Sequence, residues 1–148
     1  MHNPTKTESP FDLERFVKAQ ATSYNLARAE LRRGHKTGHW MWYIFPQIAG
    51  LGLSEMSQRF AISSRQEAVA YLDHPILGPR LIEVCEIVHG INDRSMSEVF
   101  GYPDDLKLKS SLTLFAKVAE DNPIFAATIG KHFGGQYDQR TLDLLHRR

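Results

Sequence analysis

The sequence predicts an all-α protein, namely one compact domain of about seven to nine short helices over residues 11–148. Three observations support this prediction. Apolar residues recur every three or four positions in most segments, as they do on one face of a helix. Residues that cap or end helices separate those segments at short intervals. No stretch keeps the sustained alternation of apolar and polar residues that is typical of a half-buried strand.

The N-terminal part of the chain begins with a polar stretch. Residues 1–10, MHNPTKTESP, include two prolines, so we expect a loose tail there. An apolar helical stripe follows and consists of Leu13, Phe16, Val17, Tyr24, Ala27 and Leu31. Thr22 or Ser23 could cap a second helix within this stripe. Gly34 follows two arginines and is expected to end it.

The middle of the chain contains loops and three predicted helices. We expect mostly loop after Pro46, with a short helix near 54–60. Ser64 and Glu67 form a capping-box pattern, which predicts a helix that begins there and ends before Pro75. A further helix over 76–89 has one apolar face and is expected to end at Gly90.

Four more helices are predicted in the last third. Asp93 or Ser95 could begin a short helix that stops at Gly101. Pro103 suits the first turn of a helix that continues to about residue 120. Similar capping patterns predict helices after Asn122 and after Asp138.

Composition and charge exclude several classes of function. The net charge is +1, so no overall field favours nucleic acid or an anionic membrane as a partner. The chain has neither an apolar signal core at its N-terminus nor a run of apolar residues long enough to span a membrane, so we expect a cytoplasmic protein. The single cysteine, Cys85, lies in an apolar helical pattern and is expected to be buried.

Residues 34–47, GHKTGHWMWYIFPQ, contain both tryptophans of the chain and are the leading candidate for a binding site. If this segment is a short helix closed before Pro46, Lys36, His39 and Tyr43 lie on one side of it. Trp40 lies beside them, and Gln47 could turn back toward them. The same residues are also consistent with a half-buried core element. A buried strand over WMWYI is a further alternative.

A second cluster begins at Gly101 and includes Asp105, Lys107 and Lys109. The proline and aspartates are typical of a helix start. A helix N-terminus with nearby lysines can also hold an anion. His35 and His39 have the spacing of a metal-binding pair, but the segment lacks a glutamate and an evident third ligand, so we expect no metal. No nucleotide-binding or hydrolase motif indicates a cofactor.

The chain resembles the bacterial family filed as domain of unknown function 1810, some members of which carry the label "calpastatin-like". The resemblance covers almost the whole chain and is most specific at HWMWYIFPQ (39–47) and VFGYPDDLKLKSSLTLF (99–115). It implies a compact all-α domain with armadillo-like helical packing, and it implies no established activity. It also favours a shared site at these two segments.

Two functional hypotheses follow, and neither establishes an enzyme. In the first, Lys36 and Lys107 bind the anionic group of a small ligand, for example a nucleotide-like one, and Trp40 or Tyr43 stacks against its ring. His39 or Asp105 would then transfer a proton. In the second, the chain is a helical module that binds a protein partner without catalysis, and the aromatic run is part of its scaffold.

Overall fold

The computed structural model describes residues 10–147, and this part of the chain contains ten helices and no strand. In chain order they are α2 (Glu14–Ala21), α3 (Tyr24–Arg33), α4 (Met41–Ile44), α5 (Glu55–Arg59), α6 (Arg65–Asp73), α7 (Leu77–His89), α8 (Met96–Phe100), α9 (Asp104–Val118), α10 (Ile124–Phe133) and α11 (Gln139–Arg147). The prediction of a single all-α domain is confirmed. The expected N-terminal tail lies almost entirely outside the described residues.

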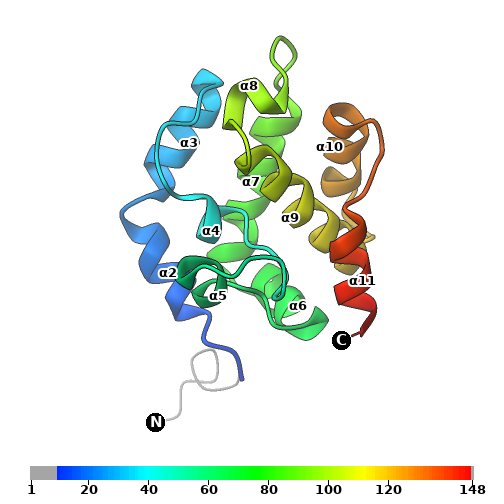
Figure 1. Ribbon diagram of the computed structural model, residues 1–148. Helices are drawn as coiled ribbons and strands as arrows, with labels where there is room; N and C mark the ends of the chain where they lie inside the picture. The colour runs from blue at the N-terminus through cyan, green and yellow to red at the C-terminus, as the bar shows by residue number, and fades with distance from the viewer. Residues whose placement is uncertain (1–9, 148) are drawn as a thin grey trace.

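Two long helices, α7 and α9, hold the domain together (Figure 1). Helix α7 contacts α3, α6 and α10, and helix α9 contacts α6, α8, α10 and α11. Helices α2 and α3 lie on one side of the molecule, and α10 and α11 lie on the other (Figure 1). The short helix α4 packs against α2, so the aromatic run is placed among elements from the first third of the chain.

A chain of aromatic rings forms the centre of the core. Phe16 lies 5.1 Å from Tyr71, and Tyr71 lies 5.6 Å from Phe115, measured between ring centroids. Phe125 continues the series at 5.8 Å from Phe115. These rings come from α2, α6, α9 and α10, so burying them joins both sides of the domain. Full burial of such side chains supplies much of the stability of a domain.

Helix ends follow the predicted capping chemistry closely. The side chain of Ser64 accepts a hydrogen bond from the backbone N–H of Glu67, as predicted, but Glu67 returns its bond to the N–H of Ser63 rather than to Ser64. Ser95 forms a complete capping box with Glu98 at the start of α8. Gly34 has a positive φ of 74° at the end of α3, which explains why a glycine ends this helix.

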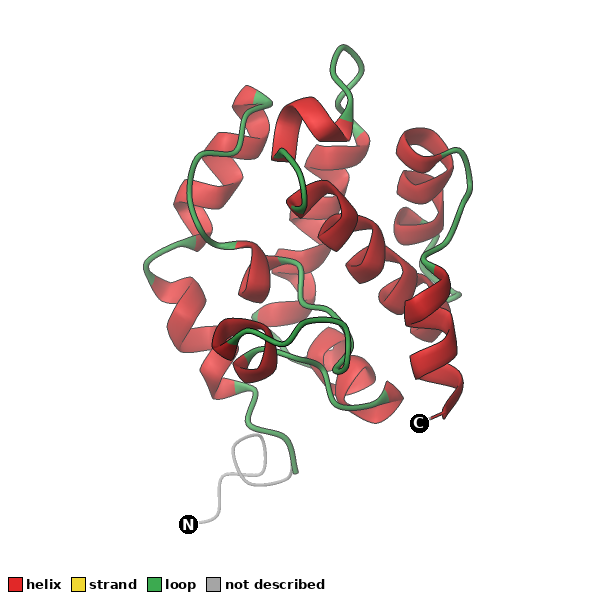
Figure 2. Ribbon diagram, in the orientation of Figure 1, coloured by secondary structure: helices red, strands yellow, loops and turns green. Residues whose placement is uncertain are grey.

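The prediction for residues 34–47 is wrong in one respect. Only Met41–Ile44 are helical, while residues 35–40 form a non-helical connection, and the strand alternative is also excluded. The segment from Phe45 to Ser54 is loop as well (Figure 2). A single parallel bridge between Ile48 and Ile62 ties this loop to the stretch before α6.

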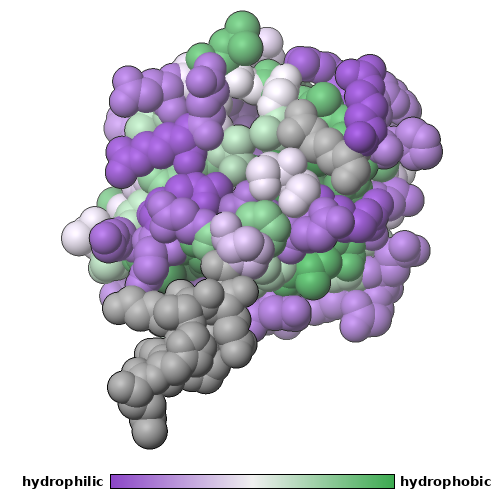
Figure 3. Space-filling model, turned by 90° about the horizontal axis from the view of Figure 1, so that it is seen from below, coloured by the Kyte–Doolittle hydropathy of each residue, from purple (hydrophilic) through white to green (hydrophobic). Residues whose placement is uncertain are grey.

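The surface carries mainly polar side chains. On the face shown in Figure 3, hydrophilic residues surround smaller hydrophobic areas. Within residues 10–147, no helix combines the length and the apolar character needed to cross a membrane.

Candidate functional site

Residues 35–40 form a loop whose start is fixed by two backbone hydrogen bonds. The N–H of His35 donates to the carbonyl of Glu30 at 3.1 Å, and the N–H of Lys36 donates to the carbonyl of Val99 at 2.8 Å. The loop therefore joins the end of α3 to α8 before it enters α4. Because Lys36 and His39 are not on a helix, the single helical stripe expected for Lys36, His39 and Tyr43 does not exist.

The buried carboxylate of Glu30 organises this loop. It accepts hydrogen bonds from the backbone N–H groups of Thr37 and Gly38 at 2.8 and 2.9 Å, from the Thr37 hydroxyl at 2.9 Å and from the Trp40 indole N–H at 3.0 Å. Desolvation by itself raises the pKa of Glu30, but these four donors outweigh it and lower the pKa to about 2. A charged carboxylate is therefore a permanent part of the fold at neutral pH.

Trp40 belongs to the core. It is 1% exposed, and its ring lies 6.3 Å from both Phe45 and Phe100. Its only polar atom already donates to Glu30. Since protein covers the ring, Trp40 offers no free face to a ligand, and its predicted stacking role is not supported by the structure.

The structure brings the two predicted lysines together around Asp104. The ammonium of Lys36 lies 2.7 Å from one carboxylate oxygen of Asp104 and also donates to the carbonyl of Gly38 at 2.6 Å. The ammonium of Lys107 lies 3.6 Å from the other oxygen. The Lys36 side chain is only 6% exposed, whereas that of Lys107 is 25% exposed. Lys107 is thus the lysine that remains accessible.

Trp42 lies beside Lys107 and was not predicted as a site residue. The ammonium of Lys107 lies 5.1 Å from the centroid of the Trp42 ring, which is within the range of a cation–π contact. The indole Nε1 of Trp42 is buried and has no hydrogen-bond partner among the described residues. The hydroxyl of Ser111 is also buried and has no hydrogen-bond partner among the described residues. Ser111 follows Lys107 by one turn on the same side of α9.

The remaining predicted site residues have other surroundings. His39 is exposed, and its side chain forms no observed hydrogen bond or ion pair with another residue of the range 10–147. The Tyr43 hydroxyl bonds to Ser23 at 3.0 Å, at the junction of α2 and α3. Gln47 is half-buried and uses its backbone carbonyl to accept from Ile62. Asp105 accepts the N–H of the next residue at 2.9 Å, as an aspartate at a helix start often does.

The geometry therefore supports a smaller site than expected. It consists of Trp42 and Lys107, with Asp104 and Lys36 beside it, and we call this group the Trp42 site. His39 and Asp105 are not brought into contact with each other by any observed interaction, so the predicted proton transfer has no support here. Within residues 10–147, no group of three or more histidine, cysteine or acidic side chains is arranged to hold a metal.

Comparisons with known proteins give a family but no activity. A search of curated proteins found no match to this chain. The crystal structure of the conserved hypothetical protein Rv1873 from Mycobacterium tuberculosis is similar, with a TM-score of 0.92 and 53% sequence identity over 93% of this chain and 99% of that chain. Residues 10–145 match the family described as "Protein of unknown function (DUF1810)", and the chain therefore belongs to that family.

Proposed function

We propose that the chain binds a small anionic ligand at the Trp42 site, through oxygen atoms that accept a hydrogen bond from the Trp42 indole. The observation that carries this proposal is the buried Nε1 of Trp42, which has no partner in the described residues. An indole N–H is a donor only, so it requires an acceptor. Leaving such a group unsatisfied costs about 1–3 kcal/mol.

The contrast between the two tryptophans supports this proposal. The indole of Trp40 is satisfied by the carboxylate of Glu30 at 3.0 Å. Among the described residues, no carboxylate accepts a hydrogen bond from the Trp42 indole. The charged group observed next to its ring is the ammonium of Lys107. A ligand oxygen with negative charge would satisfy the indole and would also be attracted by that ammonium.

The charge balance around Asp104 favours an anion for the same reason. One carboxylate faces two ammonium groups, and it lies closer to Lys36 than to Lys107. The partly exposed Lys107 is therefore only partly neutralised within the protein. A carboxylate or phosphate group on the ligand would complete this arrangement without displacing Lys36 from its buried position.

Titration with oxyanions tests the proposal. Melting temperature and calorimetric binding would be measured with acetate, inorganic phosphate, AMP and ADP-ribose. We expect saturable binding of at least one of them, and loss of that binding in Trp42→Phe, which removes the donor but keeps an aromatic ring. Lys107→Met should weaken binding by roughly five- to thirtyfold, because a charge-assisted contact contributes on the order of 1–2 kcal/mol.

Lys109→Met is the matched control, since it removes the same charge from the same helix two positions away. It should bind the ligand like the unmodified protein. Undiminished binding by Trp42→Phe would contradict the proposed site. The absence of saturable binding across all four oxyanions would contradict the proposed ligand class.

The alternative function, a protein-interaction module, is supported by a separate observation. Tyr102 and Leu106 are large hydrophobic residues that are 81% and 49% exposed, and both lie at the start of α9. A double substitution, Tyr102→Ser with Leu106→Ser, should then abolish capture of a protein partner from a cell extract while leaving oxyanion binding unchanged. Capture that survives this double substitution would argue against the alternative.

A further inference from the structure

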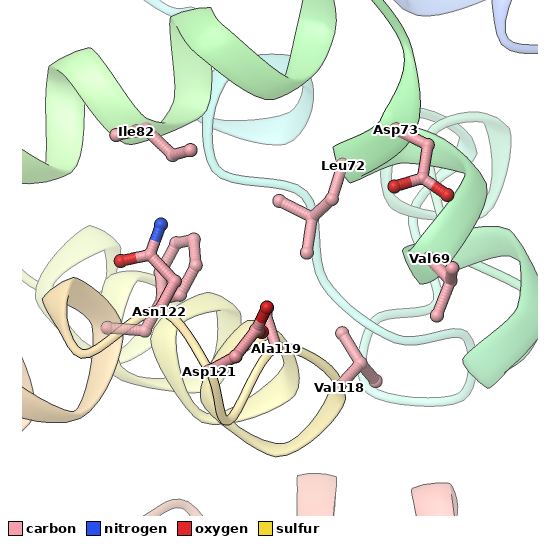
Figure 4. Close-up of a pocket in the computed structure, with 9 residues that line it drawn as sticks. Val69, Leu72, Asp73, Ile82, Val118, Ala119, Asp121 and Asn122 are labelled. Atoms are coloured by element: carbon pink, nitrogen blue, oxygen red, sulfur yellow. The ribbon is translucent and has the colours of Figure 1, made fainter.

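A cleft lies between α6, α7 and the connection from α9 to α10, formed by residues outside the Trp42 site. Its volume is about 330 Å³. The apolar lining consists of Val69, Leu72, Ile82, Val118, Ala119 and Phe125. Figure 4 shows the Leu72 and Ile82 side chains directed into the space from one side and Val118 directed into it from the other. Small-molecule sites usually begin at about this size, so the cleft suits a small, largely apolar ligand.

The polar groups of the cleft are acidic or neutral. Asp73, the last residue of α6, and Asp121, in the connection between α9 and α10, lie on either side of Leu72 in the close-up (Figure 4). Both are exposed, and neither forms an ion pair with any described residue. The third polar residue is Asn122, and none of the lining residues is basic. The cleft therefore carries negative charge that the described part of the protein does not neutralise.

The helices add to this negative potential. Helix α6 ends at Asp73 and helix α9 ends at Val118, so the carbonyl ends of two helices meet at the cleft. The C-terminal end of a helix carries a partial negative charge and favours cations. Helix α10 begins at the same place with the opposite polarity, but its first N–H, that of Ile124, is already bonded by the Asn122 side chain at 3.1 Å.

The neighbouring basic side chains are held elsewhere. The ammonium of Lys117 lies 4.9 Å from the centroid of the Tyr137 ring. The guanidinium of Arg65 donates to the backbone carbonyl of Lys117 at 3.3 Å. Neither lines the cleft. Apolar walls, two unpaired carboxylates and two helix C-termini thus share one small space.

We propose that this cleft binds a small aliphatic ammonium compound. The alkyl chain would lie on Leu72, Ile82 and Val118, where removing its CH₂ groups from water favours binding. The ammonium group would lie at the opening, attracted by Asp73 and Asp121. This site is separate from the Trp42 site and takes a ligand of the opposite charge, so the two proposals can fail independently.

The probe is n-hexylamine, which is protonated at neutral pH, and the comparison compounds are hexanoate and hexanol. Methyl NMR spectra of the whole chain would be recorded during each titration. We expect hexylammonium to shift the Leu72, Ile82 and Val118 methyl signals in a saturable way. Hexanol should bind at least threefold more weakly and hexanoate more weakly still, because only the ammonium is attracted by the carboxylates.

Variants separate the contributions of charge and of shape. Asp73→Asn and Asp121→Asn should each weaken hexylammonium binding by roughly two- to fivefold, as expected for exposed ion pairs. Glu120→Gln, which removes an exposed carboxylate next to Asp121 that does not line the cleft, is the matched control and should have no effect. Ala119→Leu should abolish binding by filling the space, provided that its melting temperature shows a folded protein.

Three results would overturn the proposal. Equal binding of hexylammonium and hexanoate would mean that charge plays no part. Unchanged binding of hexylammonium in both aspartate variants would also mean that charge plays no part. Shifts confined to methyl groups outside the cleft would place the ligand elsewhere. Trp42→Phe should bind hexylammonium normally, so its result bears only on the oxyanion site.

Discussion

Replacing Glu30 with glutamine tests whether one buried carboxylate holds the loop that leads into α4. Its pKa in the folded protein is about 2, compared with 4.5 for an unperturbed glutamate. At about 1.4 kcal/mol per pKa unit, this difference corresponds to roughly 3 kcal/mol of stability at neutral pH. Glutamine keeps the shape of the side chain but makes only neutral hydrogen bonds, which are about half as strong as those to a charged acceptor.

The contribution of Glu30 to the free energy of unfolding should decrease as the pH falls. Because folding lowers the pKa of Glu30, its contribution is complete above pH 4.5 and is lost as the pH falls toward 2. The difference in unfolding free energy between the wild-type protein and Glu30→Gln should therefore fall from about 3 kcal/mol at pH 7 to about 1.5 kcal/mol at pH 3. Urea denaturation followed by tryptophan fluorescence at several pH values measures both quantities.

A second carboxylate provides the control. Glu98 accepts the backbone N–H of Ser95 at 2.8 Å in the capping box of α8, but it is exposed to solvent. Glu98→Gln should destabilise the protein much less than Glu30→Gln. The reasoning is refuted if Glu30→Gln costs less than about 1 kcal/mol at pH 7, or if its cost is the same at pH 7 and pH 3.

Three further predictions concern the core. Gly78→Ala should destabilise the protein strongly, because the added Cβ would lie 2.0 Å from the backbone carbonyl oxygen of Leu72. The Cβ added by Gly130→Ala meets open space, so this substitution should stabilise α10 by about 0.5–1 kcal/mol. Thermal melting of the two variants checks both predictions. Burial raises the pKa of the Cys85 thiol, so a thiol reagent should react with it only after unfolding, and rapid reaction with the native protein would contradict this. Gln20→Leu leaves a buried tyrosine hydroxyl and a backbone carbonyl without their donor and should cost about 2–3 kcal/mol in urea denaturation.

Local signals in the sequence predicted most of the fold. Gly34, Ser64 and Ser95 mark helix ends in the structure as they do in the sequence, because capping depends on residues only three or four positions apart. The break between α2 and α3 at Thr22 and Ser23 was among the expected alternatives. Each of the ten helices in residues 10–147 lies in a segment for which a helix was considered, although the overall estimate was about seven to nine.

The candidate site was predicted less completely, since its contacts join distant parts of the chain. Lys36 and Lys107 were both selected, but Asp104, which holds them together, was interpreted only as part of a helix start. Glu30 was missed as well, because a glutamate within an amphipathic helix gives no sign that it is 1% exposed. A loop that contains Thr37 and Gly38 offers free backbone donors, and this was the one available signal for a buried acceptor.

The different surroundings of Trp40 and Trp42 could not be predicted from the sequence. Trp40 and Trp42 are two residues apart, and in helical backbone such residues point in nearly opposite directions. In a strand the same spacing would place both rings on one face, so the spacing alone does not indicate which ring faces the core. In the structure the two rings differ in their partners: the carboxylate of Glu30 binds the Trp40 indole, whereas Trp42 lies beside Lys107 on α9. The carboxylate of Glu30 thus satisfies the indole of Trp40, ten residues later in the chain, whereas the indole of Trp42 has no partner among the described residues, and only the folded structure reveals this difference.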